Sequence, residues 1–296
     1  MAFIRTPSGI ANFRLFVGVD IVVYVEGRVA PEDMREGIVA PDERFYGGLL
    51  AALVPSKKFL VKCVGNKDAA LAYAAQISRN DLNDTFVIVD RDYSGMTHTA
   101  LMSPCVVETF GYSWENDIWT FDLCSALLAQ LYVAPSSIAS MQFRQLKKRL
   151  RLLSAMDCAM KLSNAALLKK SSSFGGIGFR FSDEYLVGVS DFRRLLSVFK
   201  ASPAYHCSLS RDLVRVANKL PAEKVIQGHL WSNGIRGWIA HLYKAATKDT
   251  APSKLVLLSL AISAFQADVR SIFEPTTLAH YQAQLRTVLS NPKLVV

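Results

Sequence analysis

The stretches VYVEG (residues 23–27) and VIVDRDYSG (residues 87–95) decide how this sequence is interpreted. Each begins with a run of Val and Ile, which is typical of a buried strand. Each run ends in carboxylates, with Glu26 after the first and Asp90 and Asp92 after the second. Placing carboxylates directly after an apolar strand costs free energy unless a charged group lies against them. The two stretches therefore raise the question of what that group is.

The first half of the chain alternates apolar runs with helical patterns. Because this alternation is typical of βαβ units, we expect an α/β fold with a parallel sheet covered by helices on both faces. The expected strands are 20–25, 58–64, 85–89 and 104–109, and the expected helices are 42–54, 66–78 and 113–132. Ligands of such sheets bind beyond the carboxyl ends of the strands. Glu26, Asp90 and Asp92 all fall at that edge.

The second half of the chain is mostly helical by pattern. We therefore predict an α/β domain over residues 1–134, with an insertion at about 27–41, followed by a helical domain over residues 135–296. Residues 1–135 hold 11 Lys and Arg against 16 Asp and Glu, a net charge of −5, and the remainder holds 23 against 9, a net charge of +14. A basic half joined to an acidic half suggests a polyanionic partner such as nucleic acid. A basic surface that only faces solvent is the alternative.

Composition argues against several classes of protein. With 51% hydrophobic and 20% charged residues the chain can bury a core and is not disordered. The longest apolar run, at 255–265, is too short to span a bilayer, and no secretory signal is visible, so we expect a cytoplasmic protein without a membrane partner. The five cysteines are scattered and form no CxxC pair, which argues against a zinc site or a disulfide framework. No phosphate-binding glycine motif follows a strand, so we do not expect this chain to hydrolyse nucleotides.

The three strand-end acids predict a metal site. Like charges that lie close together in a cleft either share protons or are neutralised by a cation. Oxygen ligands with no Cys or His nearby suit Mg²⁺ or Mn²⁺. If the strand continues, its period of two directs Asp90 and Asp92 the same way. A divalent ion held by these acids and Glu26 would stabilise an attacking water and a leaving oxygen in phosphoryl transfer.

Three features together resemble a known family: the Glu-Gly after the first strand, the DRD after the third, and YSWEN at 112–116. They are similar to the Toprim nucleases that act as effectors of bacterial anti-phage defence, and most similar to the effectors of the PARIS system, which pair with an ABC-type ATPase. The resemblance covers about residues 15–135 and extends loosely into the helical half. It implies a Toprim, Rossmann-like fold for the first domain.

The resemblance also implies roles for single residues. Glu26 would be the acid/base carboxylate and a metal ligand, and Asp90 and Asp92 would be metal ligands. Glu115 would complete the site, and Lys67 would offset charge in the transition state. By the residues alone, Glu115 could instead belong to a capping box with the nearby Ser113.

The chain departs from the family at one point. Relatives place an acid a few residues after the Glu-Gly, whereas here the matching Asp42 of DERFY follows an insertion of about a dozen residues. Whether Asp42 or its neighbour Glu43 reaches the metal is left open.

The family implies a toxic RNA endonuclease, with tRNA as the expected substrate, that carries out abortive infection. An ATPase partner would hold it inactive until a phage protein triggers release, and the active form would be a homodimer. The residues alone do not decide between DNA and RNA. Two alternatives stay open: a phosphohydrolase whose DxD supplies a nucleophile, and a catalytically silent module that binds nucleic acid or protein.

RQLKKRLR (144–151) concentrates positive charge on one expected helix beside a row of leucines. A solvated amphipathic face is the commoner explanation, but the charge asymmetry favours a surface that contacts a phosphate backbone. The predicted nucleic-acid-binding residues are Lys147, Lys148, Arg149, Arg151, Arg193 and Arg194. Among the histidines, His229 is a candidate base, although a core or capping role is commoner. Trp231 and Trp238 lie seven residues apart, hence on one helix face, in a core or an interface.

Overall fold

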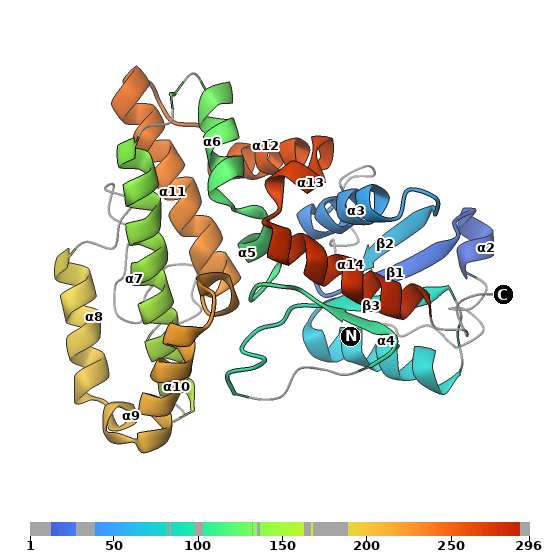
Figure 1. The fold of residues 1–296 in the computed structure, drawn as a ribbon, viewed down its shortest axis with the longest axis horizontal. Helices are drawn as coiled ribbons and strands as arrows, with labels where there is room; N and C mark the ends of the chain where they lie inside the picture. The colour runs from blue at the N-terminus through green and yellow to red at the C-terminus, as the bar shows by residue number, and fades with distance from the viewer. Residues whose placement is uncertain are drawn as a thin grey trace. The chain divides into compact units, whose positions relative to one another are not determined.

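The fold is given by a computed structural model that describes residues 13–27, 39–80, 82, 84–97, 103–131, 133–134, 137–162, 167 and 189–290 (Figure 1). The chain divides into two compact units. The first is drawn from Met1–Arg91, Ala100–Ile118 and Ile262–Val296, and the second from Asp92–Thr99 and Trp119–Ala261. This division differs from the one predicted at residue 134, because the last helices pack with the sheet. Most of the predicted insertion, residues 28–38, lies outside the described residues.

The first unit is built on a four-stranded parallel sheet, as the βαβ pattern predicted. Its strands are β1 (Ile21–Val25), β2 (Phe59–Cys63), β3 (Thr85–Val89) and β4 (Val106–Glu108), in the spatial order β2-β1-β3-β4. Each matches a predicted segment to within two residues. The two central strands, β1 and β3, are buried at every residue, as expected for strands covered on both faces.

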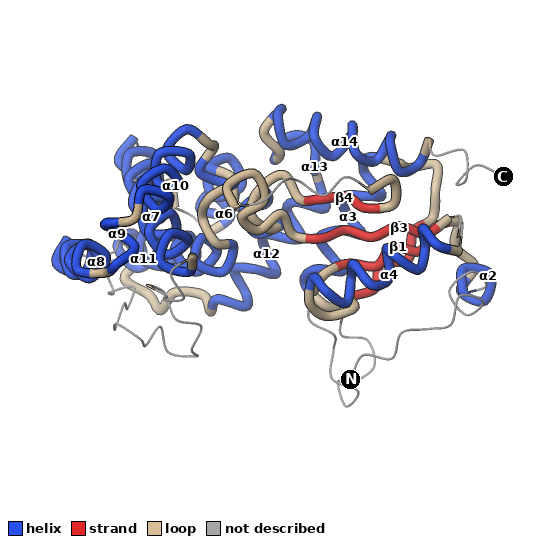
Figure 2. Tube along the Cα trace, turned by 90° about the horizontal axis from the view of Figure 1, so that it is seen from below, coloured by secondary structure: helices blue, strands red, loops and turns tan. Residues whose placement is uncertain are grey.

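Helices cover both faces of this sheet (Figure 2). The helices of the first unit are α2 (Phe13–Val17), α3 (Pro41–Leu53), α4 (Lys67–Arg79), α5 (Trp114–Ile118), α13 (Val269–Ile272) and α14 (Pro275–Leu289), together with the end of α12 (Lys254–Ala267). Helix α4 lies on one face, α3 lies on the other, and α14 runs along the edge strand β4. The edge is thereby protected, because Gln284 and His280 of α14 hydrogen-bond to the main chain of Glu108.

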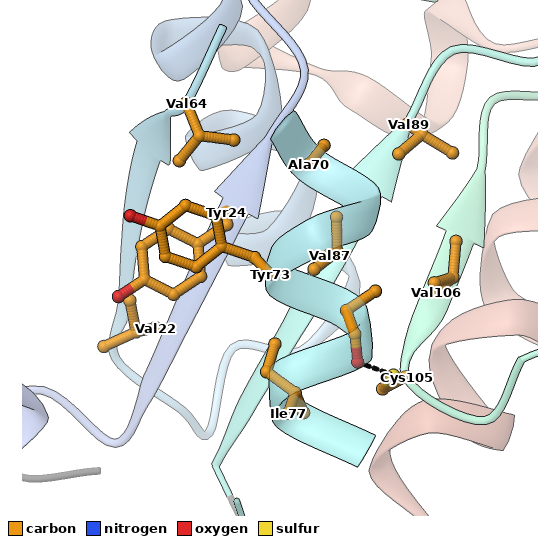
Figure 3. Packing of buried hydrophobic residues seen from close by; sticks show 11 residues of the cluster. Val22, Tyr24, Val64, Ala70, Tyr73, Ile77, Val87, Val89, Cys105 and Val106 are labelled. Carbon is orange, nitrogen blue, oxygen red and sulfur yellow. Dashed lines mark hydrogen bonds between the residues drawn. The ribbon is translucent and has the colours of Figure 1, made fainter. Parts of the chain in front are cut away.

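The α4 face is packed by alternate residues of the strands (Figure 3). Tyr24 of β1 stacks on Tyr73 of α4 with 4.3 Å between ring centroids. On the opposite face, Phe45 of α3 stacks on Trp114 at 5.0 Å and on Phe265 at 4.8 Å. Aromatic pairs of this kind add to the free energy of simple burial. They fix α3 and α5, which carry predicted site residues, against the sheet.

The second unit is helical, as the sequence predicted. Its helices are α6 (Phe121–Gln130), α7 (Ser137–Lys161), α8 (Val189–Ala201), α9 (Pro203–His206), α10 (Ser208–Lys219), the 3₁₀ helix η1 (Ala222–Lys224) and α11 (Gly228–Thr247), with the start of α12. Trp231 and Trp238 of α11 are buried against Phe143 of α7, with centroids 5.4 and 5.5 Å apart, so both belong to the core. Within the described residues, each helix is too short or too polar to span a lipid bilayer.

Candidate active site

The order of the strands in the sheet indicates where the candidate site lies. In a doubly wound sheet, ligands bind at the carboxyl edge where neighbouring strands continue in opposite directions across the sheet. Here that point lies between β1, from which the chain moves to β2, and β3, from which it moves to β4. Glu26 directly follows β1 and Asp90 directly follows β3. Two predicted metal ligands therefore come from the two strands that flank this point.

The structure brings Glu26 and Asp90 into direct contact. The main-chain N–H of Asp90 donates to Oε2 of Glu26 at 3.1 Å, and the main-chain N–H of Glu26 donates to the carbonyl of Ile88 at 3.0 Å. Both acids are half-buried. They are thus held at one strand end by the ladder itself, and Oδ1 of Asp90 is buried.

Lys67 lies at the same strand end. It is the first residue of α4, whose N-cap Asn66 accepts a hydrogen bond from the N–H of Ala69 at 3.0 Å. The Lys67 ammonium donates to the main-chain carbonyl of Asp90, and lies 3.5 Å from that of Arg91. A positive charge therefore lies against the main chain that directly follows β3.

Asp42 and Glu43, in the first turn of α3, make different contacts. Oε1 of Glu43 accepts the N–H of Cys63, the last residue of β2, at 3.0 Å. Asp42 faces the strand end instead, because a Cβ added to Gly27 would lie 3.0 Å from its Oδ1. A side chain at position 27 would displace Asp42, so glycine there permits the close approach. Asp42, rather than Glu43, therefore lies against Gly27, the residue that follows Glu26.

Glu115 is held within its own helix start. Oε2 of Glu115 accepts from the Ser113 hydroxyl at 2.6 Å. Asn116 supplies one half of a capping box, because its Oδ1 accepts the Ser113 N–H at 3.2 Å; its own N–H donates to the Ser113 carbonyl at 3.0 Å. The intervening Trp114 donates its ring N–H to Asp42 at 3.0 Å. The first turn of α5 is thereby tied to Asp42.

Two buried tyrosines that the sequence analysis missed lie among these acids. Burial raises the pKa of Tyr46 well above its usual value, and Asp90 and Asp42 add to the effect. Burial and then Asp117 raise the pKa of Tyr281. Both hydroxyls stay protonated at neutral pH. Tyr46 lies four residues after Asp42, so the helical period could have placed it on the same face.

Glu108 is a further acid that was missed. It ends β4, is 4% exposed, and its Oε1 makes no hydrogen bond within the described part of the chain. Its register partner on β3 is Val89. The rule that selected Glu26, an acid at the carboxyl end of an apolar strand, could also have selected Glu108.

The remaining predicted residues lie in the second unit. Asp92 is the first residue of that unit, whereas Glu26 and Asp90 belong to the first unit. Lys147 forms an ion pair with Glu223, and His229 is exposed in the first turn of α11. Of the other predicted nucleic-acid-binding residues, the exposed ones are Lys148, Arg193 and Arg194, and the half-buried ones are Arg149 and Arg151.

The donor set fits a hard divalent cation in its chemistry. Glu26, Asp90 and Asp42 offer only oxygen, which Mg²⁺ and Mn²⁺ prefer. Cys63 lies nearby, and burial raises the pKa of its thiol. Across the residues that the structure describes, no three Cys, His, Asp or Glu side chains are grouped closely enough to hold a metal ion. Binding would therefore need these carboxylates to turn toward the ion.

Comparison with known proteins adds no relative. No protein-family model matches the chain, and no curated protein matches it significantly.

Proposed function

We propose that the chain is a metal-dependent nuclease with a Toprim-type site at the carboxyl edge of its parallel sheet. The observation that carries the proposal is the 3.1 Å contact between the Asp90 amide and Glu26 at the carboxyl ends of β1 and β3. Lys67 adds a positive charge at the same strand end. Acids and a lysine at such a point are the residue types that phosphoryl transfer requires.

Each residue has a role in this proposal. Glu26, Asp90 and Asp92 would hold Mg²⁺ or Mn²⁺, with Glu115 completing the set. An ion held by these residues would supply Lewis-acid chemistry at the scissile phosphate. Glu26 would accept a proton from the attacking water, and Lys67 would stabilise the negative charge that develops on the phosphate.

The substrate and regulation in this proposal follow the resemblance to the PARIS effectors. RNA, and tRNA in particular, is the proposed substrate, and the exposed cations of α7 and α8 support a polyanionic ligand. Cleavage would be toxic, so an ABC-type ATPase partner would restrain the nuclease in the cytoplasm until a phage protein triggers release. The active form would be a homodimer.

Cleavage by the purified chain tests the proposal. With Mn²⁺ and either total tRNA or plasmid DNA, the wild type should cut the RNA. Glu26→Gln should be at least about 100-fold slower, because it removes the base and a ligand. Asp68→Asn is the matched control, since Asp68 is an exposed acid in the first turn of α4. Equal rates for Glu26→Gln and the wild type, at equal melting temperatures, would show that Glu26 takes no part.

Salt dependence tests the nucleic-acid surface. Replacing exposed cations should lower the slope of log binding constant against log salt by about 0.7 for each lost contact to single-stranded RNA. Lys147→Ala should change the slope less, because Glu223 already pairs with Lys147. The variant for this test combines Lys148→Ala, Arg193→Ala and Arg194→Ala. An unchanged slope would place the interface elsewhere.

A catalytically silent binding module is the second candidate, and one observation favours it. The candidate carboxylates already accept protein donors: Glu26 from the Asp90 amide, Glu115 from Ser113, and Asp42 from Trp114. Calorimetric titration with Mn²⁺ separates the two functions. Heat that is seen with the wild type and lost in Glu26→Gln supports the nuclease, and no heat in either supports the module.

A further inference from the structure

The loop that carries Asp92 is built into the helical unit. The chain leaves the first unit after Arg91, and the second unit begins at Asp92. Asp92 and Gly95 have φ values of 54° and 82°, in the left-handed region. The N–H groups of Met96 and Thr97 donate to the Tyr93 carbonyl at 2.9 and 3.1 Å. These bonds make residues 92–97 a compact turn centred on Tyr93.

Tyr93 anchors the turn through its side chain. It is 9% exposed. The amide of Gln227 donates to its hydroxyl at 2.9 Å, and the hydroxyl lies 3.5 Å from the Ser154 carbonyl. The Lys161 ammonium lies 5.5 Å from the ring centroid, within the range of a cation–π interaction.

Asp157 of α7 fixes the amide of Gln227. Asp157 is fully buried, and its Oδ2 accepts from Gln227 Nε2 at 2.6 Å and pairs with Lys161 at 2.8 Å. Its Oδ1 accepts the N–H of Leu167 at 2.9 Å. A buried charge that is paired and hydrogen-bonded on both oxygens holds its partners in one arrangement. The amide nitrogen of Gln227 therefore donates one hydrogen to the Asp157 carboxylate and the other to the Tyr93 hydroxyl.

A second anchor is apolar. Met96, three residues after Tyr93, packs against a small cluster formed by Ala155 of α7, Ala217 of α10 and Val225. The turn is thus fixed at Tyr93 by polar contacts and at Met96 by apolar packing. Asp92 directly precedes the polar anchor.

We propose that Gln227 and Asp157 are positioning residues for Asp92, acting through the Tyr93 hydroxyl. The inference rests on the proposed function, in which Asp92 is a metal ligand. Groups that orient a ligand typically contribute about 10- to 100-fold to metal affinity or activity.

Two variants remove the network without touching Asp92. Tyr93→Phe deletes only the hydroxyl, and Gln227→Ala deletes the amide that joins Tyr93 to Asp157. Ser232→Ala is the matched control, because it removes a buried 3.0 Å hydrogen bond from Trp119 in the same unit. Calorimetry gives the Mn²⁺ dissociation constant, hydrogen exchange reports on residues 92–97, and melting gives stability.

Both network variants should bind Mn²⁺ about 10-fold more weakly and exchange faster over residues 92–97. Saturating Mn²⁺ should restore cleavage by Tyr93→Phe, because Asp92 itself remains. Ser232→Ala should lose stability alone. If the variants lose stability but keep the wild-type Mn²⁺ affinity, the network is only structural and the positioning role is wrong. If the wild type binds no Mn²⁺, the metal-dependent nuclease is wrong, and the positioning role falls with it.

Discussion

Replacing Asp117 by Asn should destabilise the first unit by about 2–4 kcal/mol. Asp117 is 2% exposed. Its Oδ1 accepts the N–H of Gly111 at 2.7 Å, and its Oδ2 accepts the N–H of Phe110 at 3.2 Å and the hydroxyl of Tyr281 at 2.6 Å. The carboxylate thus holds the loop before α5 and ties it to α14.

The magnitude follows from these donors. An asparagine has one oxygen and one NH₂ group, so in either orientation its NH₂ faces a main-chain N–H, of Gly111 or of Phe110. A buried donor left without an acceptor costs about 1–3 kcal/mol. The other bonds lose their charge-assisted character, which adds about 1 kcal/mol. Tyr281 can partly compensate, because its hydroxyl can rotate to accept.

Urea unfolding followed by circular dichroism measures the change. Asp122→Asn is the matched control, since Asp122 is an exposed acid in the first turn of α6 and should change stability by less than about 0.5 kcal/mol. Cleavage should also fall in Asp117→Asn, because Trp114 and Glu115 share its helix. A loss of stability no larger than that of the control would refute the reasoning that Asp117 holds this loop.

Three further predictions follow from the site and its surroundings. Gly27→Ala places a methyl group 2.8 Å from the Cys63 sulfur and 3.0 Å from Asp42. It should therefore lower the free energy of unfolding in urea by about 1–3 kcal/mol and slow cleavage. An unchanged free energy and cleavage rate would contradict the close approach of Asp42 to Gly27. The pKa of Tyr46 is raised mainly by burial, so the folded state keeps a proton that the unfolded chain loses near pH 10. The free energy of unfolding therefore falls as the pH rises further. From pH 10 to 11 the wild type should lose about 1 kcal/mol more than Tyr46→Phe, and equal losses would oppose this. Main-chain amides at the start of α10 lower the pKa of the exposed thiol of Cys207. Iodoacetamide at neutral pH should therefore label Cys207 before the other cysteines, which mass spectrometry would detect. Slower labelling of Cys207 would contradict a lowered pKa.

The sheet could be predicted because its signal is local. Runs of Val and Ile bounded by polar residues gave all four strands, and both central strands are buried at each residue. The expected helix over 113–132 is divided, because Thr120 caps α6 by accepting the N–H of Leu123. That helix start was present in the sequence and was missed within a continuous apolar pattern.

The place of the C-terminal helix could not be predicted. α14 joins the sheet through Tyr281, which bonds Asp117, and through Gln284, which bonds the main chain of Glu108. These partners are separated by more than 160 residues in the chain. Periodicity shows that a helix has an apolar face, but it carries no information on which surface that face covers.

The acids show the same limit within the candidate site. The strand-end rule found Glu26 and Asp90, because the direction of parallel strands brings their carboxyl ends together whatever the loops do. It did not find that Asp42 faces Gly27 while Glu43 does not. The contact of Glu115 with Ser113 was one of two alternatives that the sequence left open. Those choices depend on rotamers and contacts within one helical turn, which spacing alone leaves open.

Acids that hold a fold and acids that act in chemistry look alike in a sequence, but their hydrogen-bond donors separate them. A metal ligand must give up protein donors to bind the ion, so a buried carboxylate with every oxygen engaged makes a poor ligand. Asp117 and Asp157 each accept from three donors and are buried, whereas Glu26 and Asp90 are half-buried at the strand edge. Substitution by the matching amide should therefore lower stability more than cleavage at the first pair, and cleavage more than stability at the second. The reverse pattern would overturn the assignment of the site to the carboxyl ends of β1 and β3.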